Sequence, residues 1–375
     1  MLAALSCKAQ VITGAERTGL YLPMLQGKRV GVVTNNTGMI GNTHLVDSLV
    51  AFGVNVKTVF APEHGFRGDA DAGANVSTYK DSKTGIDVIS IYGSNVKPKA
   101  ADIKALDIVV FDIQDVGLRY YTYLSSMHYV MEACAENGVE LIVLDRPNPN
   151  GFYVDGPILE KKHVSFVGMH PIPTVHGMTL GELARMINGE GWLPGGERCR
   201  LTIVPCLGYT HQTRYTLPVK PSPNLPDMRS IYLYPSLCFF EGTPLSIGRG
   251  TDFPFQVIGH PALKDKSFSF TPISTSGATN PPLKGQECYG YDLRTQPSDA
   301  VLWSNGVDLS YVVECYKELG LGAKFFLPIF DKLTGTDYVR EMIIDGKSAA
   351  GIEAVWKDGV EKFKIQRKPY LLYEE

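Results

Sequence analysis

The stretch VELIVLDRPNPNG, residues 139–151, decides the fold class. Its apolar residues follow one another without the alternation of a half-exposed strand, which is typical of a strand buried on both faces of a parallel sheet. Two prolines then end the strand, because proline has no amide hydrogen to give to a central strand. A strand buried on both faces needs helices on each side of its sheet, so alternating strands and helices are expected around it.

The segments around this strand do alternate. Further strands are expected at residues 28–36, 55–65, 86–93, 106–117 and 199–206. Helices are expected at residues 43–53, 97–107, 121–138 and 179–189. In the last helix, Thr179 and Glu182 have the spacing of a capping box. This rhythm predicts an α/β fold: a Rossmann-like open parallel sheet with helices on both faces.

The sequence changes character after about residue 210. Proline and glycine become frequent in residues 218–227 and 269–282, and one helix is predicted at 308–320, from Asp308 as cap to Gly320 as stop. We therefore expect a Rossmann-like domain over residues 11–210 and a smaller C-terminal α+β domain over residues 211–375.

Composition excludes several classes of partner. The 375 residues carry a net charge of −3, which gives no electrostatic reason to expect nucleic acid or an anionic membrane as partner. No apolar run approaches the roughly 18 residues of a membrane helix. The seven cysteines are scattered, with no Cys-x-x-Cys and no Cys/His pair at ligand spacing, so structural zinc is not expected.

Polar clusters follow four of the expected strands. They are TNNTG (34–38), PEHGFRGD (62–69), DIQDVGLRYYTY (112–123) and DRPNPNG (145–151). Any one of them could be turn chemistry, since Asn, Asp, Gly and Pro favour turns for backbone reasons. In open α/β sheets, however, ligands bind outside the carboxyl ends of the strands. Four such clusters together predict one shared active site.

A dinucleotide site is the obvious alternative for such a sheet. It needs a G-x-G-x-x-G turn after the first strand, so that the pyrophosphate can approach a helix N-terminus. This chain has TNNTGMIGN (34–42) instead, with Asn35 and Asn36 where the first glycines would stand. P-loop and G-x-S-x-G motifs are also missing from the sequence. We therefore expect the fold without a cofactor.

Glu63 and His64 lie in the second cluster and suggest two kinds of chemistry. A zinc protease would need two histidines at i and i+4, so no metal is expected here. Glu63 better suits proton or nucleophile chemistry. Glycoside cleavage commonly uses two carboxyl groups, and the candidate partners are Asp112, Asp115 and Glu241.

Structural roles compete with these chemical ones. Glu63 could instead form a salt bridge with Arg67. In the stretch 234–255, two glycines flank Arg249, which suggests a backbone close to a ligand. A guanidinium there suits a carboxylate, because it can donate paired hydrogen bonds. An interdomain salt bridge is the alternative for Arg249.

Long motifs occur in a fixed order along the chain. They are APEHGFRGD (61–69), FDIQDVGLRYYTY (111–123), LDRPNPNG (144–151), HGMTLGELA (176–184), SPNLP (222–226) and FEGTPLSIGRGTDFPF (240–255). In these motifs, from about residue 28 to the C-terminus, the chain resembles the NamZ-type exo-β-N-acetylmuramidases, a glycoside hydrolase family once catalogued as a domain of unknown function. Pro244 departs from the pattern, where a polar residue is expected.

The resemblance implies release of terminal N-acetylmuramic acid from the non-reducing end of peptidoglycan fragments. It also implies a catalytic Rossmann-like domain and a smaller domain that closes the cleft. The presumed catalytic glutamate of the family matches Glu63, which we expect to be the general acid. The second catalytic group stays open between Asp112, Asp115 and Glu241, and so does the stereochemical course, which includes catalysis assisted by the acetamido group.

The expected sugar carries hydroxyls, an acetamido group and a lactyl carboxylate. Amides and hydroxyls for the first two are Asn35, Asn36, Tyr120 and Tyr121, and the candidate cations are Arg249 and Arg119. His64 would orient Glu63 or bind the substrate. The other predicted substrate-binding residues are Arg67, Asp145, Arg146, Asn148 and His176.

Two alternative functions stay open: a non-catalytic muropeptide-binding protein, and a hydrolase of another small glycoside. The first ten residues, MLAALSCKAQ, resemble the end of a secretory signal peptide with cleavage at Ala9, so a periplasmic or secreted location is expected. Cys7 also resembles a lipoprotein site, which is the weaker match.

Overall fold

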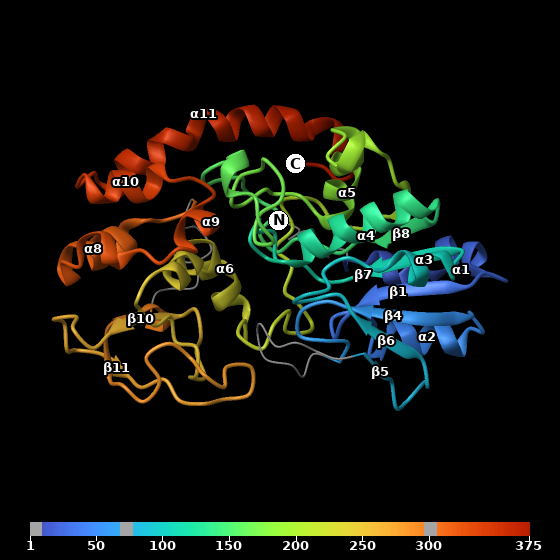
Figure 1. Cartoon of the computed structure of the whole chain (residues 1–375), viewed down its shortest axis with the longest axis horizontal. Coiled ribbons are helices and arrows are strands. Elements are labelled where there is room, and N and C mark those ends of the chain that lie inside the picture. The colour runs from blue at the N-terminus through green and yellow to red at the C-terminus, as the bar shows by residue number, and fades with distance from the viewer. Residues whose placement is uncertain (1–9, 68–77, 296–305) are drawn as a thin grey trace, which may run out of the picture.

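The computed structural model describes residues 10–67, 78–295 and 306–375. Two lobes lie side by side, a sheet-containing lobe at the right of Figure 1 and a smaller one at the left. The residues of the expected leader before Gln10, Cys7 among them, lie outside the described residues.

A seven-stranded sheet forms the first lobe, in the order β5-β6-β4-β1-β7-β8-β9. The parallel strands are β1 (Val30–Thr34), β4 (Val56–Ala61), β6 (Asp87–Ser90), β7 (Ile108–Asp112), β8 (Glu140–Leu144) and β9 (Arg200–Val204). Only the short edge strand β5 (Tyr79–Lys80) runs antiparallel among the described strands of this sheet. Counted along the parallel strands, the order is 3-2-1-4-5-6, which is that of the Rossmann fold. The predicted open parallel sheet is confirmed.

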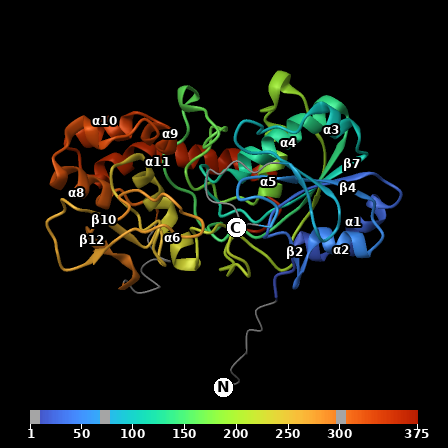
Figure 2. The same cartoon turned by 60° about the horizontal axis from the view of Figure 1, so that its bottom comes forward.

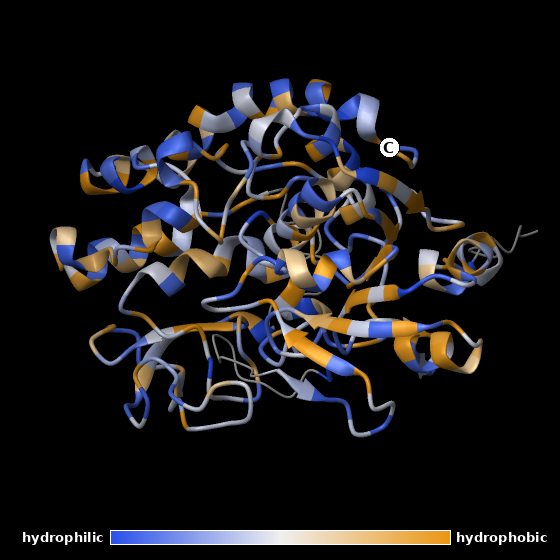
Figure 3. Ribbon diagram, turned by 45° about the vertical axis from the view of Figure 1, so that its right-hand side comes forward, coloured by the Kyte–Doolittle hydropathy of each residue, from blue (hydrophilic) through white to orange (hydrophobic). Residues whose placement is uncertain are grey.

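Helices cover both faces of this sheet. They are α1 (Thr18–Leu25) and α2 (Leu45–Ala51) on one face, and α3 (Ala100–Lys104), α4 (Tyr123–Asn137) and α5 (Leu180–Gly189) on the other. Neighbouring residues of β1 point to opposite sides: Val32 packs in the cluster that holds Leu49 of α2, and Val33 in the cluster that holds Met127 of α4. Figure 3 shows apolar residues concentrated along the strands, as burial on both faces requires.

Two helix ends follow the sequence signals. The helix α4 stops at Gly138, which adopts a left-handed conformation with φ 67°. At the start of α5, the Thr179 amide donates to the Glu182 carboxylate (2.9 Å) and the Thr179 hydroxyl accepts from the Glu182 amide (3.3 Å). This confirms the predicted capping box. A short hairpin, β2 (Met39–Ile40) and β3 (Thr43–His44), follows β1.

The smaller lobe combines helices with a three-stranded antiparallel sheet. The strands, in the order β10-β12-β11, are Val257–His260, Cys288–Asp292 and Ser269–Phe270. The helices are α6 (Met228–Leu237), α8 (Ser310–Leu319), α9 (Phe330–Thr334), α10 (Tyr338–Ile344) and α11 (Ala349–Arg367), with a 3₁₀ turn, η4 (Cys238–Gly242), after α6. The helix predicted at 308–320 is confirmed as α8, and Gly320 is its left-handed C-cap. Its N-cap is Leu309, not the predicted Asp308, whose carboxylate accepts from the Ser310 amide at 2.7 Å. The other four helices among the described residues of this lobe were not predicted.

One apolar core runs through both lobes. The same cluster of buried residues contains Phe111 of β7, Phe240 of η4 and Trp356 of α11. The helix α11 reaches from the smaller lobe across to the sheet lobe (Figures 1 and 2), where Arg185 of α5 donates to the carbonyl oxygen of Tyr370 at 2.8 Å. A site between the lobes is therefore built on a common core. Among the described helices, none has the length and apolarity to cross a membrane.

Candidate active site

A hollow of about 660 Å³ lies where the two lobes meet. The sheet lobe contributes residues that follow the carboxyl ends of β4, β6 and β7, and the smaller lobe contributes residues from α6 onward. The polar side chains that line it are those of Glu63, His64, Tyr92, Tyr120, Tyr121, Thr122, Ser222, Tyr234, Glu241, Arg249, Thr279 and Asn280. The volume lies within the range of about 300–1,000 Å³ that small-molecule sites have.

Glu63 is carried by a tight turn directly after β4. The amide of Gly65 donates to the carbonyl oxygen of Pro62 at 3.0 Å. His64, within this turn, has a φ of 68°, a left-handed conformation that is uncommon for a residue with a side chain. Its buried imidazole lies 3.2 Å from the Ser222 hydroxyl, in the segment that leads to the smaller lobe. Strained backbone of this kind is concentrated at functional sites.

Two hydroxyl groups hold the carboxylate of Glu63. Tyr92, which follows β6, donates to Oε1 at 2.8 Å, and Thr122, which precedes α4, donates to Oε2 at 2.7 Å. Burial, together with the neighbouring Glu63, raises the pKa of Tyr92, so this phenol keeps its proton and remains a donor. The carboxylate is therefore fixed in one orientation at the wall of the hollow.

The smaller lobe places an ion pair in the same hollow. Nε and Nη2 of Arg249 lie 2.8 and 2.7 Å from Oε1 of Glu241. Nη1 of Arg249 makes no hydrogen bond to the described residues. The flanking glycines are explained by the chain itself: Gly248 and Gly250 have φ near 80°, and a Cβ on Gly250 would collide with the carbonyl oxygen of Ile273. The ion pair is formed within one lobe, not between the two.

Tyr120 and Tyr121 present their rings, rather than free hydroxyls, to the hollow. The Tyr120 hydroxyl donates to the carbonyl oxygen of Pro235 at 2.7 Å, and the Tyr121 hydroxyl donates to that of Pro221 at 2.8 Å. Both residues connect the sheet lobe to the segment that enters the smaller lobe.

The predicted residues Asn35, Asn36 and Asp115 lie outside the lining of this hollow. Asn35 is buried, and its Oδ1 accepts from the amide and hydroxyl of Thr37 at 2.9 and 2.6 Å. The Asn36 amide group donates to the carbonyl oxygen of Lys220 at 3.2 Å. Asp115 accepts from the Gly117 amide at 2.6 Å, and burial raises the pKa of its carboxyl to about 7. These side chains shape turns, as Asn and Asp commonly do.

Asp112 and Arg146 form a buried ion pair at the carboxyl ends of β7 and β8. Nε and Nη2 of Arg146 lie 2.6 and 2.9 Å from the two carboxylate oxygens of Asp112. Nη2 also donates to the carbonyl oxygen of Met39 at 2.9 Å. Arg146 lines a second hollow, not the one that contains Glu63.

The side chains of Arg119 and Arg67 bind other groups of the protein. Arg119 is fully buried and donates to four backbone carbonyls, those of Pro157, Ile172, Leu333 and Thr334, at 2.6–3.1 Å. Burial lowers the pKa of its guanidinium to about 10. Arg67 pairs with Asp81 at 3.0 Å and with Asp47 at 3.5 Å, so it is not the partner that the salt-bridge alternative gave to Glu63.

Asp145, Asn148 and His176 lie in a buried polar network around the C-terminal tail. Asp145 accepts from the hydroxyls of Thr179 and Tyr373 at 2.7 and 2.6 Å, and burial raises the pKa of its carboxyl to about 6. Asn148 donates to the carbonyl oxygen of Met178 at 2.9 Å. His176 is fully buried, and burial lowers its pKa to about 3, so it stays neutral.

One group of possible metal ligands exists among the described residues. Glu160, His163 and Asp337 bring one ligand atom each within 4.8 Å of one another. The ammonium of Lys162 lies 2.5 Å from Asp337 and 3.2 Å from Glu160. This cation already compensates the carboxylates, so the group fits an ion-pair cluster better than a metal site.

Sequence reasoning missed two residues that contact Glu63. Tyr92 stands next to the end of the expected strand 86–93, so it was predictable that it lies at the same sheet edge as Glu63. Thr122 stands inside the quoted motif 111–123 but was not singled out.

Two family models match the chain and together cover most of it. They are described as "Exo-beta-N-acetylmuramidase NamZ, N-terminal", over residues 30–229, and "Exo-beta-N-acetylmuramidase NamZ, C-terminal", over residues 232–373. The chain belongs to the NamZ family. Among the relatives of this NamZ family chain is the Bacillus subtilis (strain 168) peptidoglycan β-N-acetylmuramidase NamZ, which is 39% identical over 386 residues, covering 94% of this chain and 89% of the relative.

Solved structures support the same membership. Two DUF1343 family proteins of Bacteroides fragilis NCTC 9343 share the fold of this NamZ family chain. One is 53% identical, with a TM-score of 0.91 over 98% of this chain and 100% of the other. The second is 29% identical, with a TM-score of 0.80 over 97% and 99%.

Proposed function

We propose that this chain is an exo-acting glycoside hydrolase that releases terminal N-acetylmuramic acid from the non-reducing end of peptidoglycan fragments, with Glu63 as general acid. Membership of the NamZ family and the name of the Bacillus subtilis relative support the reaction and the substrate class. The observation that carries the role of Glu63 is its position in a hollow lined by both lobes, directly after a parallel strand.

The proposed reaction is hydrolysis of an acetal. Glu63 donates a proton to the glycosidic oxygen as the bond from that oxygen to the anomeric carbon breaks. Water then supplies a hydroxyl group to the anomeric carbon and a proton that restores Glu63. The hydrogen bonds from Tyr92 and Thr122 restrict rotation of the carboxyl group, which keeps its proton directed at the leaving oxygen.

Of the three candidates for the second catalytic group, Glu241 is the one that lines this hollow. Asp112 is neutralised by Arg146, and Asp115 caps a turn. We assign Glu241 an orienting role, because its Oε1 already faces the Arg249 guanidinium. Assistance by the acetamido group of the substrate is compatible with this arrangement, since it needs one acid and one orienting carboxylate.

Arg249 is the proposed determinant for the muramic acid side chain. N-acetylmuramic acid differs from N-acetylglucosamine by its lactyl ether, which carries a carboxylate. Nη1 of Arg249 makes no hydrogen bond to the described residues, although Nε and Nη2 are both held by Glu241. A guanidinium that is oriented in this way can donate to a substrate carboxylate at little entropic cost.

We also propose that the chain acts in the periplasm or as a secreted protein, where peptidoglycan lies. Fractionation of cells that express the chain from its own start codon, followed by immunoblotting, tests this location. Recovery with the cytoplasmic fraction alone would contradict it.

A synthetic disaccharide with N-acetylmuramic acid at its non-reducing end tests the function. Proton NMR from the first minute is expected to show free N-acetylmuramic acid, and the anomer that forms first gives the stereochemical course. Saturable binding without sugar release over hours would favour a muropeptide-binding protein. Equal cleavage of the matching glucosaminide would favour a hydrolase of another glycoside.

A further inference from the structure

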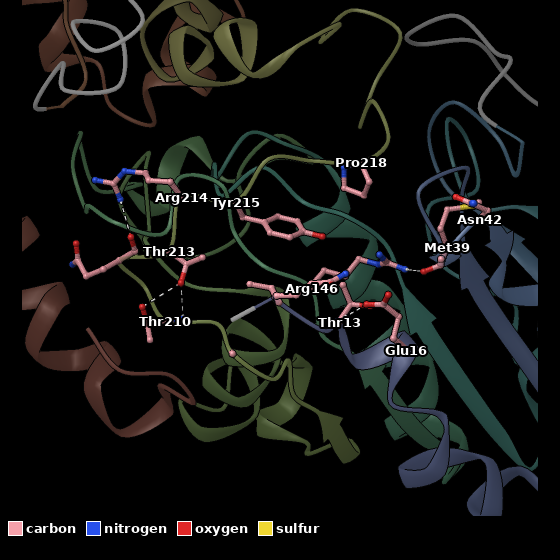
Figure 4. Close-up of a pocket in the computed structure, with 15 residues that line it drawn as sticks. Thr13, Glu16, Met39, Asn42, Arg146, Thr210, Thr213, Arg214, Tyr215 and Pro218 are labelled. Atoms are coloured by element: carbon pink, nitrogen blue, oxygen red, sulfur yellow. Dashed lines mark hydrogen bonds between the residues drawn. The ribbon is translucent and has the colours of Figure 1, made fainter. Parts of the chain in front are cut away.

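A second hollow, of about 750 Å³, opens at the carboxyl edge of the same sheet (Figure 4). Its walls come from the first described residues, from the β2–β3 hairpin, from Arg146 after β8, and from residues 208–218 after β9. None of the described residues that line it also lines the hollow of Glu63. It lies near the point where the strand order reverses, between β1 and β7, which is a common ligand position in open α/β sheets.

A buried donor faces this second hollow. The Arg146 side chain is 5% exposed, and Asp112 and the Met39 carbonyl fix two of its three nitrogens. Its remaining nitrogen, Nη1, makes no hydrogen bond to any described residue. Nη1 is not one of the fully buried side-chain atoms that lack a partner, so it is accessible from the hollow and can take a partner there. The opening of the hollow is the direction from which that partner can come.

Tyr215 supplies a second donor beside the first. Figure 4 shows its ring over the hollow, with the hydroxyl on the side of the Arg146 guanidinium. This hydroxyl also makes no hydrogen bond to the described residues. Burial raises the pKa of Tyr215, so the phenol is protonated and able to donate. Two donors therefore converge on one place.

The charged groups around the second hollow carry both signs. Arg146 is neutralised by Asp112. The Glu16 carboxylate accepts from the amide and hydroxyl of Thr13 at 2.8 and 2.9 Å. The Arg214 guanidinium lies over the Phe152 ring, 3.5 Å from its centroid. No strong field of one sign results, so a neutral ligand that carries hydrogen-bond acceptors fits better than a phosphate or a polyanion.

The rest of the lining combines short polar groups with apolar surface. Thr210 and Thr213 present hydroxyls 3.3 Å apart, and Asn42 presents an amide. In Figure 4, the Tyr215 ring and Pro218 give flat apolar faces between Thr213 on one side and Asn42 on the other. Pyranose sugars have this dual character, with hydroxyls at the rim and C–H groups on the faces, and tyrosine rings are suited to both.

We propose that this hollow is a second saccharide site, which binds a neutral N-acetylhexosamine unit with its acetamido carbonyl at Arg146 Nη1 and the Tyr215 hydroxyl. The site is separate from that of Glu63, and binding there does not require hydrolysis of the sugar. In a protein that acts on glycan fragments, such a site would hold a second sugar and so retain the fragment.

Saturation-transfer NMR and calorimetry with N-acetylglucosamine test this proposal on the full chain. Saturable binding is expected, with weaker binding of glucose, which lacks the acetamido carbonyl. Tyr215→Ala is expected to weaken N-acetylglucosamine binding about tenfold or more, since ring contact and donor are both lost. Tyr289→Ala, in β12 of the smaller lobe, is the matched control and should bind as the wild type does.

Three results would overturn the proposal: no saturable binding, equal binding of glucose, or unchanged binding by Tyr215→Ala. Tyr215→Phe keeps the ring and removes only the hydroxyl, so it provides a milder variant if Tyr215→Ala does not fold. Binding is read out independently of hydrolysis, so the test stands whether or not Glu63 is the general acid.

Discussion

The hydroxyl of Tyr92 lies 2.8 Å from Oε1 of Glu63, although 29 positions separate the two residues. The contact arises because β4 and β6 are parallel neighbours, which brings the residues after both strands to one edge of the sheet. A hydroxyl donor that is itself half-buried keeps the carboxyl group oriented before substrate arrives. The contact between Tyr92 and Glu63 explains why a charged turn follows the buried strand β4.

Glu63→Gln should remove proton donation while leaving the fold intact. The amide is isosteric with the carboxyl group, and general acid catalysis contributes about 10²–10⁴-fold to rate. With a natural disaccharide we expect kcat to fall by that amount. With an aryl muramide, whose leaving group needs little protonation, the loss should be much smaller. Equal losses on both substrates would show that Glu63 does not protonate the leaving group.

Glu287→Gln is the matched control for this substitution. Glu287 is exposed in the smaller lobe, accepts from the hydroxyls of Ser269 and Tyr289, and is not one of the residues that line the hollow. Its turnover and its thermal unfolding should equal those of the wild type.

Tyr92→Phe should disturb catalysis through the orientation of Glu63. The variant keeps the ring and deletes one hydrogen bond, so we expect kcat to fall about tenfold with KM nearly unchanged. With an aryl muramide, whose leaving group needs little protonation, the loss should be smaller. An unchanged kcat with both substrates would mean that Tyr92 only packs against the site.

Much of the sheet lobe could be predicted because local signals and tertiary structure agree there. Apart from Glu140, the run 139–144 is apolar, and β8 is buried on both faces as that pattern requires. In the smaller lobe the agreement is weaker. The helix α6 contains Pro235 and follows a proline-rich segment, which hides it. By contrast, α11 has a helical apolar stripe of Ile352, Trp356, Val360 and Phe363, so its signal was present.

The candidate site was harder to predict, because residue type alone does not separate a ligand contact from a structural one. Arg119 stands beside Tyr120 and Tyr121 in one motif, yet its four carbonyl acceptors come from segments between residues 157 and 334 that only the folded chain brings together. Asp145 likewise binds Tyr373, 228 positions away. Glu63 was found because its strand-end position already implied exposure at the sheet edge.

Asp115 should make stability depend on pH. Burial raises its folded pKa to about 7, against about 4 in the unfolded chain, so its contribution to stability is complete below pH 4 and is lost as pH rises through 7. Asp115→Asn keeps the acceptor for Gly117 and cannot ionise. We compare the free energy of unfolding of the variant with that of the wild type at each pH by urea titration. The difference should favour the variant by a few kcal/mol more at pH 8 than at pH 5. A constant difference across this range would contradict the assignment.

Arg119 should contribute to the stability of the fold and not to substrate binding. Arg119→Ala leaves the carbonyls of Pro157, Leu333 and Thr334 without this donor, whereas that of Ile172 keeps the Leu159 amide. Unsatisfied buried groups cost about 1–3 kcal/mol each. We expect the free energy of unfolding to fall by at least about 3 kcal/mol, measured by urea titration. Arg119→Lys should recover little of it, because one ammonium cannot reach acceptors on both sides of a guanidinium. A variant of wild-type stability with a raised KM would instead indicate substrate contact.

Arg249 should set the preference for the muramide over the glucosaminide. Its Nη1 is proposed to donate to the lactyl carboxylate, a charge-assisted bond worth about 1.5–3 kcal/mol. Arg249→Gln should therefore lower kcat/KM for the muramide roughly ten- to a hundredfold, mainly through KM, and change that for the glucosaminide little. Because the substitution also leaves Glu241 without its cation, Glu241→Gln is needed beside it: that variant keeps Arg249 and should retain the preference. If Arg249→Gln lost kcat/KM equally on both substrates, the ion pair would serve only to shape the hollow. The lactyl carboxylate of the substrate would then have to bind another residue.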